Sequence, residues 1–139
     1  MTPVVYVLDT NMVGYIAVGN SPAARRKMSE FHGQAVIAVS AITEGEILYG
    51  LARKPEAVRL RAAMESLLAT MEILPWDSDA ARAYGTLRAG MQTAGKTLSA
   101  MDMLIAAHAV VHRAVLVTAD TAFKQVGPLL PTQNWATEL

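Results

Sequence analysis

The chain has 139 residues, which suits a single domain over 1–139 and leaves no room for a second. Its 12 basic and 12 acidic residues give a formal net charge of +0, without the basic excess that indicates nucleic-acid binding by itself, and the absence of cysteine excludes disulfides and thiolate chemistry. No apolar run approaches the ~20 residues that span a bilayer, so we expect a cytoplasmic protein that enters no membrane.

The first half of the chain alternates apolar runs with helical signals. The runs are continuous and rich in β-branched residues, which is the pattern of strands buried on both faces. The helices are marked by Ser or Thr at the start, Pro in the first turn, or Gly after the end. In chain order, the expected elements are a strand over 4–8, a helix near 22–32, a strand over 35–39, a helix from Ser40 and Thr43 to about Leu51, and a helix from Pro55 to about Thr70.

The second half continues this alternation. The expected elements are a short strand over 71–74, a helix capped by Asp77 or Ser78 and ended by Gly95, a helix from Ala100 to about His112 capped by Ser99, a strand over 114–117, a short helix through Phe123 and a weak strand over 133–135. Because strands and helices alternate throughout, we predict an α/β fold in three layers, with a mostly parallel central sheet and helices on both of its faces.

Four acidic residues lie just after expected strands or at the start of the helices that follow. Asp9 closes the first strand, and Glu46 lies near the first turn of the helix after the second strand. Asp102 lies in the first turn of its helix, and Asp120 follows the 114–117 strand by three residues. Ligands of such sheets bind beyond the carboxyl ends of the strands, where the strand order reverses. All four carboxylates are therefore expected at the same edge of the sheet.

Carboxylates that converge in a small space repel one another, so their pKa values rise or they bind a cation. Oxygen ligands in this number favour Mg²⁺ or Mn²⁺ over zinc. An ion held in this way polarises a phosphoryl oxygen and lowers the pKa of a bound water. The reaction that this chemistry favours is hydrolysis of a phosphodiester bond.

Each acidic residue also has a purely structural interpretation. Asp9 and Asp120 stand where helix N-caps would stand, and Glu46 and Asp102 follow a Thr or Ser by three residues, as in a capping box. On this alternative the chain is a non-catalytic binding module whose apolar helices form a docking surface. Sequence spacing alone leaves both interpretations open.

Five sequence blocks, in this order and spacing, carry a resemblance to a known family. They are VLDTN at 7–11, SAITEGEILYG at 40–50, DMLIAAHA at 102–109, LVTADTAF at 116–123 and the pair NW that ends at Trp135. These blocks resemble the motifs of the VapC-type toxins, which are PIN-domain ribonucleases. The resemblance covers nearly the whole chain.

The resemblance implies a PIN-like α/β/α domain and an Mg²⁺- or Mn²⁺-dependent endoribonuclease, the toxin of a type II toxin–antitoxin pair. It implies that four residues are both catalytic and metal-binding, namely Asp9, Glu46, Asp102 and Asp120. Glu46 is preferred to Glu44 because it stands three residues before the Tyr-Gly pair at 49–50. Asn11 and Thr118 are implied as supporting residues that hold carboxylates or water by hydrogen bonds.

The same resemblance implies three partners: an RNA substrate, with transfer RNA favoured, a VapB-like antitoxin and a second copy of the chain in a homodimer. The apolar helices between Tyr49 and Leu67 are expected to contribute to the antitoxin and dimer surfaces, although core packing explains most of their residues. Seven of the 12 basic residues form a possible RNA-facing rim: Arg25, Arg26, Lys27, Arg53, Lys54, Arg59 and Arg61.

Two further alternatives, a zinc site and a phosphatase function, compete with these expectations. His108 and His112 have the spacing of two zinc ligands on one helix, but the glutamate of a zinc-protease motif is missing and packing is the better interpretation. A phosphatase of the haloacid-dehalogenase type also places an Asp after its first strand. Asn11 stands where that enzyme class carries its second Asp, which disfavours this alternative.

Overall fold

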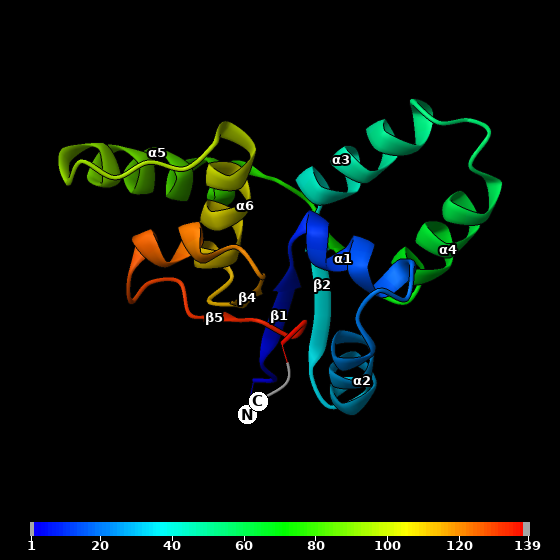
Figure 1. Cartoon of the computed structure of the whole chain (residues 1–139). Helices are drawn as coiled ribbons and strands as arrows, with labels where there is room; N and C mark the ends of the chain where they lie inside the picture. The colour runs from blue at the N-terminus through cyan, green and yellow to red at the C-terminus, as the bar shows by residue number, and fades with distance from the viewer. Residues whose placement is uncertain (1, 138–139) are drawn as a thin grey trace.

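A five-stranded sheet in which every strand pair is parallel organises the structure, a computed structural model that describes residues 2–137 (Figure 1). The strands lie in the order β3-β2-β1-β4-β5. Their bounds are Val5–Leu8 for β1, Val36–Ser40 for β2, Glu72–Leu74 for β3, Val115–Val117 for β4 and Thr132–Gln133 for β5.

The strand order reverses between β1 and β4. The chain moves outward from β1 to β2 and β3, then returns to place β4 against the other side of β1. Leu8 pairs with Val117 in register, and the backbone N–H of Asp9 donates to the Val117 carbonyl at 3.0 Å. The residues that follow these two strands, Asp9 and Thr118, therefore emerge side by side at the switch point.

Six α-helices and one 3-10 helix of the described residues connect the strands. They are α1 (Thr10–Ala17), α2 (Pro22–Phe31), α3 (Ala41–Ala52), α4 (Val58–Leu68), α5 (Ser78–Thr93), α6 (Ala100–Val111) and η1 (Thr121–Val126). The expected caps are confirmed, since Ser21, Asp77, Ser99 and Asp120 each accept a backbone N–H at the start of their helices. Helix α1 was not predicted, and it follows β1 without a connecting loop.

Alternate strand residues face two separate cores, so the predicted three layers are confirmed. Tyr6 and Leu8 of β1 pack against α1, α2, α3 and α4, whereas Val7 packs against α5 and α6. Figure 1 shows α5 and α6 on one side of the sheet and α1 to α4 on the other. No helix of the described residues is long and apolar enough to cross a membrane.

The last expected strand lies earlier than predicted, at Thr132–Gln133 rather than 133–135. Trp135 leaves the sheet because its indole fills the core, where it is 2% exposed. Its ring lies 5.2 Å from that of Tyr6 and 5.6 Å from that of Phe31, measured between ring centroids. This aromatic group joins the C-terminal segment to β1 and α2.

Candidate active site

Asp9 ends β1 and caps α1, and its carboxylate is only 5% exposed. Its Oδ1 accepts the backbone N–H of Met12 at 2.9 Å, and its Oδ2 accepts the hydroxyl of Thr118 at 2.5 Å. Burial raises the pKa of Asp9, the bonds from Thr118 and Met12 lower it, and the charges of Asp102 and Asp120 raise it again, with a net upward shift. The capping interpretation of Asp9 is therefore correct, but capping leaves this carboxylate buried beside two others.

Thr118 links Asp9 to Asp120. Its hydroxyl oxygen donates to Asp9 and accepts the backbone N–H of Asp120 at 3.0 Å. Asp120 is exposed and caps η1, where its Oδ1 accepts the N–H of Ala122 at 2.9 Å. One side chain thus sets the position of the loop after β4 relative to the carboxylate after β1.

Asp102 lies in the first turn of α6, three residues after the N-cap Ser99. The hydroxyl of Ser99 accepts the backbone N–H of Asp102 at 3.3 Å, so the helix start fixes the backbone from which the carboxylate projects. Burial raises the pKa of Asp102, and the charge of Asp120 raises it further. Negative charge from a third chain segment therefore reaches the same edge of the sheet.

Glu46 on α3 is held by a residue that sequence reasoning missed. The hydroxyl of Thr10 donates to Glu46 Oε1 at 2.5 Å and lies 3.4 Å from the hydroxyl of Thr43. Thr10 directly follows Asp9, so this bond ties the fourth carboxylate to the neighbour of the first. The only sequence signal for this role was the presence of Thr10 in the VLDTN block.

The structure brings three of the four acidic residues into electrostatic contact and connects the fourth indirectly. The charges of Asp102 and Asp120 raise the pKa of Asp9, and the charge of Asp120 raises the pKa of Asp102, while Glu46 is linked through a hydrogen bond to the residue after Asp9. Asn11 is exposed in the first turn of α1, and its side chain makes no hydrogen bond within residues 2–137. Its supporting role stays a prediction.

The donor set fits a divalent cation, although the side chains do not form a closed cage. Within residues 2–137 no three acidic or histidine side chains are arranged to hold a metal ion as they stand. Mg²⁺ needs no such cage, because it keeps several waters and usually binds through one or two carboxylates together with substrate phosphates. The raised pKa values of Asp9 and Asp102 show the unfavourable negative charge that a cation would neutralise.

His108 lies in the core, where it is 0% exposed. Its Nδ1 is 2.7 Å from the hydroxyl of Ser40, the N-cap of α3, so a buried hydrogen bond joins α6 to the start of α3. Burial lowers the pKa of His108 and the nearby His112 lowers it further, which keeps the imidazole neutral. The environment of His108 is that of a packed, hydrogen-bonded core residue, as the sequence indicated.

Comparison with known proteins identifies one family over most of the chain. The model of the PIN domain family matches residues 6–128. The tRNA(fMet)-specific endonuclease VapC of Shigella flexneri is 30% identical over 94% of this chain and 98% of its own. The solved VapBC2 complex of Rickettsia felis, bound to a promoter DNA fragment, has a TM-score of 0.88 at 27% identity and covers 94% of this chain and 98% of its own. The DNA-bound VapBC of Salmonella typhimurium has a TM-score of 0.86 at 26% identity, with 95% and 98% covered.

Proposed function

The chain belongs to the PIN domain family and, within it, to the VapC ribonucleases. We propose that it hydrolyses RNA phosphodiester bonds with a divalent cation, Mg²⁺ or Mn²⁺, as the toxin of a type II toxin–antitoxin pair. The proposed metal-binding and catalytic residues are Asp9, Glu46, Asp102 and Asp120.

The observation that carries this proposal is the electrostatic contact of three carboxylates at the point where the strand order reverses. Asp9 follows β1, Asp102 lies in the first turn of α6 and Asp120 follows β4. Burial raises the pKa of Asp9, and the charges of Asp102 and Asp120 raise it further. A fold gains no stability from a buried acid with two like charges near it, so this convergence favours a role in cation binding.

The chain's own groups orient the reacting atoms. Thr118 holds one oxygen of Asp9 and Met12 N–H holds the other, so the carboxylate cannot rotate freely. Thr10 fixes Glu46 in the same way. A bound divalent cation would lower the pKa of a water molecule and neutralise charge on the phosphate. We assign the firmest contacts to Asp9 and Asp102, with the other two acids binding directly or through water.

We propose the partners from the relatives and from the surface. The Shigella flexneri relative is named for tRNA(fMet), which favours transfer RNA as the substrate class here. The Rickettsia felis and Salmonella typhimurium structures are VapBC complexes, which favours a VapB-like antitoxin. Leu48, Tyr49 and Val58, on α3 and at the start of α4, are 50%, 65% and 69% exposed and form the proposed antitoxin-facing surface. A homodimer is part of the same proposal.

The test is digestion of total cellular RNA by purified, antitoxin-free protein in Mg²⁺ or Mn²⁺, in EDTA, and with Asp9→Asn. We expect discrete fragments that require the metal and disappear in the variant, and sequencing of their ends identifies the RNA. Equal behaviour of wild type and Asp9→Asn in every metal condition would instead support the binding module, in which the acids act only as helix caps.

A further inference from the structure

A groove with mixed polar and apolar lining runs between α2 and the C-terminal segment 132–137. It consists of two adjoining hollows of about 570 and about 630 Å³. The first hollow is lined by Ala119, which lies between Thr118 and Asp120, so the groove begins at the acidic edge. The hollows share four lining residues, Ala23, Arg26, Asn134 and Thr137. We call this continuous depression the flank groove.

Two basic side chains line the flank groove, and a third, which precedes them in the sequence, makes a different contact. Arg26 lines both hollows and Lys27 lines the second. Arg25, by contrast, donates to the carbonyl of Ile16 at 2.7 Å and so braces the end of α1. Of the three consecutive cations, Arg25 therefore contacts α1, whereas Arg26 and Lys27 line the groove.

The groove also contains an aromatic ring and one acidic residue. Tyr15, which lines the first hollow, is 36% exposed. Glu30 lines the second hollow and lies 3.9 Å from the Lys27 ammonium, in an ion pair whose side chains are 51% and 55% exposed. An exposed pair of this length contributes little stability, so an incoming phosphate can replace Glu30 as the partner of Lys27.

We propose that the flank groove binds the single-stranded RNA next to the cleaved bond, with phosphates on Arg26 and Lys27 and one base stacked on Tyr15. This inference rests on the proposed ribonuclease function. It assigns the substrate a direction across the protein, from the acidic edge past Ala119 and along α2.

Charge complementarity and continuity with the active site carry the inference. The acidic edge repels RNA phosphates, so cations must lie along the path of the strand to offset that repulsion. The flank groove provides cations along a path that starts at Ala119, the residue before Asp120, and Tyr15 supplies the kind of aromatic surface on which single-stranded nucleic acids stack. Two other basic residues lie elsewhere, since Arg61 donates to the Leu51 carbonyl and Arg82 lies on α5, in the layer across the sheet.

The test measures a tRNA(fMet) transcript in two assays: its cleavage rate against protein concentration, and its equilibrium binding in EDTA with Asp9→Asn as the common background. Arg26→Ala, Lys27→Ala and Tyr15→Ala should each raise the half-saturating concentration about tenfold and leave the maximal rate nearly unchanged. Tyr15→Phe should restore binding because the ring is retained. Arg82→Ala, an exposed cation outside the groove, is the matched control.

Two further results separate phosphate contacts from damage to the fold. Lys27→Ala should reduce the slope of log affinity against log salt by about 0.7, the value for one lost contact to single-stranded nucleic acid. Glu30→Gln should tighten binding, because it removes negative charge from the groove. The inference is overturned if the wild type cleaves the transcript while the groove variants match Arg82→Ala in both assays. Failure of the wild type to cleave any RNA would overturn the proposed function itself.

Discussion

At the scale of single residues, the site depends on hydroxyl groups as much as on carboxylates. Thr118 donates to Asp9 and accepts from the backbone of Asp120, while Thr10 donates to Glu46. Each hydroxyl therefore fixes the position of a carboxylate at the acidic edge of the sheet.

Thr118→Val keeps the shape of this side chain and removes its hydroxyl. Asp9 loses a hydrogen bond that lowers its pKa, and the loop that carries Asp120 loses its anchor. We expect RNA cleavage and Mn²⁺ affinity to fall by ~10–100-fold. Thr93→Val, at the exposed end of α5, is the control and should behave like wild type in both measurements. An unchanged Mn²⁺ affinity in Thr118→Val would remove this residue from the site.

Asp9→Asn should stabilise the metal-free protein at neutral pH. The pKa of Asp9 is raised by folding, so its favourable contribution is complete below the unfolded value of 3.8 and is lost as pH rises through the folded value. At pH 7.5 in EDTA the variant should therefore melt at a higher temperature than wild type, and this difference should shrink towards pH 4. A lower Tm for the variant at pH 7.5 would mean that the bonds from Thr118 and Met12 outweigh the cost of burial.

The sequence nominated four acids but did not show how they are held, and their role in metal binding stays a prediction. Position after a strand and membership of a motif block selected Asp9, Asp102 and Asp120, and the structure places these three in electrostatic contact. The sequence did not indicate a role for Thr10, because a hydroxyl beside an acid has no periodicity or spacing that distinguishes it from other hydroxyls. Its role depends on α3 lying against α1, which is a tertiary contact.

At the scale of elements, α1 shows where local signals fail. It has eight residues and begins directly after its N-cap Asp9, so no loop and no separate capping motif lies between β1 and this helix. A single residue, Asp9, follows the strand and caps the helix, and the cap that the sequence allowed at Asp9 did not by itself predict a helix over 10–17. The longer helices α5 and α6 carry caps apart from the preceding strands and were predicted to within a few residues.

The burial of His108 predicts a loss of stability in mild acid. The pKa of His108 is lowered by burial and by His112, an effect that a backbone hydrogen bond to Pro75 and the charge of Asp77 partly oppose. As pH falls below 6.5, the pKa of the unfolded state, His108 binds a proton in the unfolded chain but stays neutral in the folded chain. The free energy of unfolding therefore decreases until the pH reaches the pKa of the folded state. Melting temperatures at pH 7.5 and 5.5 measure this loss.

The fall in Tm between these two pH values should be smaller in His108→Gln than in wild type, because the titrating group is gone. Ser40→Ala removes the partner but keeps the titrating histidine, so a fall in Tm should persist in this variant. Equal falls in wild type and His108→Gln would show that another group causes the acid sensitivity.

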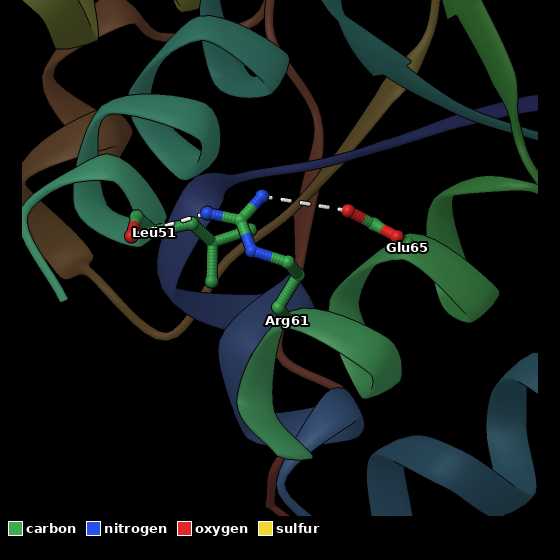
Figure 2. A network of polar contacts seen from close by, with 3 residues as sticks. All are labelled: Leu51, Arg61 and Glu65. Carbon is green, nitrogen blue, oxygen red and sulfur yellow. Dashed lines mark hydrogen bonds and ion pairs between the residues drawn. The ribbon is translucent and has the colours of Figure 1, made fainter. Parts of the chain in front are cut away.

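Arg61 joins α4 to the end of α3, as Figure 2 shows. Its guanidinium donates to the Leu51 carbonyl at 3.4 Å and lies 3.5 Å from a carboxylate oxygen of Glu65. Helix α4 has no side-chain hydrogen bond at its N-cap and no fully buried residue, so this link matters for its position. Arg61→Met should lower the free energy of unfolding by about 1 kcal/mol in urea titrations.

Glu65→Gln is the matched variant for Arg61→Met. It removes only the ion pair, whose side chains are 41% and 59% exposed, and should therefore cost less than about 0.5 kcal/mol. If Glu65→Gln destabilised the protein as much as Arg61→Met, the ion pair rather than the bond to the Leu51 carbonyl would hold α4 in place.

At the scale of the whole molecule, strand order creates the site. Alternation of strands and helices was enough to predict three layers and a parallel sheet, but it does not determine which strands are neighbours. The return of β4 to the side of β1 depends on long-range packing of both cores, in which Val117 faces one layer and Leu116 the other. Only this order places Thr118 beside Asp9 and turns scattered acids into one charged edge.

The central claim is that acids from four chain segments form one metal site, and calorimetric titration of Mn²⁺ into the purified protein tests it most directly. Wild type should bind, Asp9→Asn and Asp102→Asn should each lose most of that affinity, and Glu44→Gln, a change of one acid on α3 outside the site, should bind like wild type. Mn²⁺ binding by Asp9→Asn or Asp102→Asn with the wild-type affinity would contradict the account, because the two carboxylates would not share an ion.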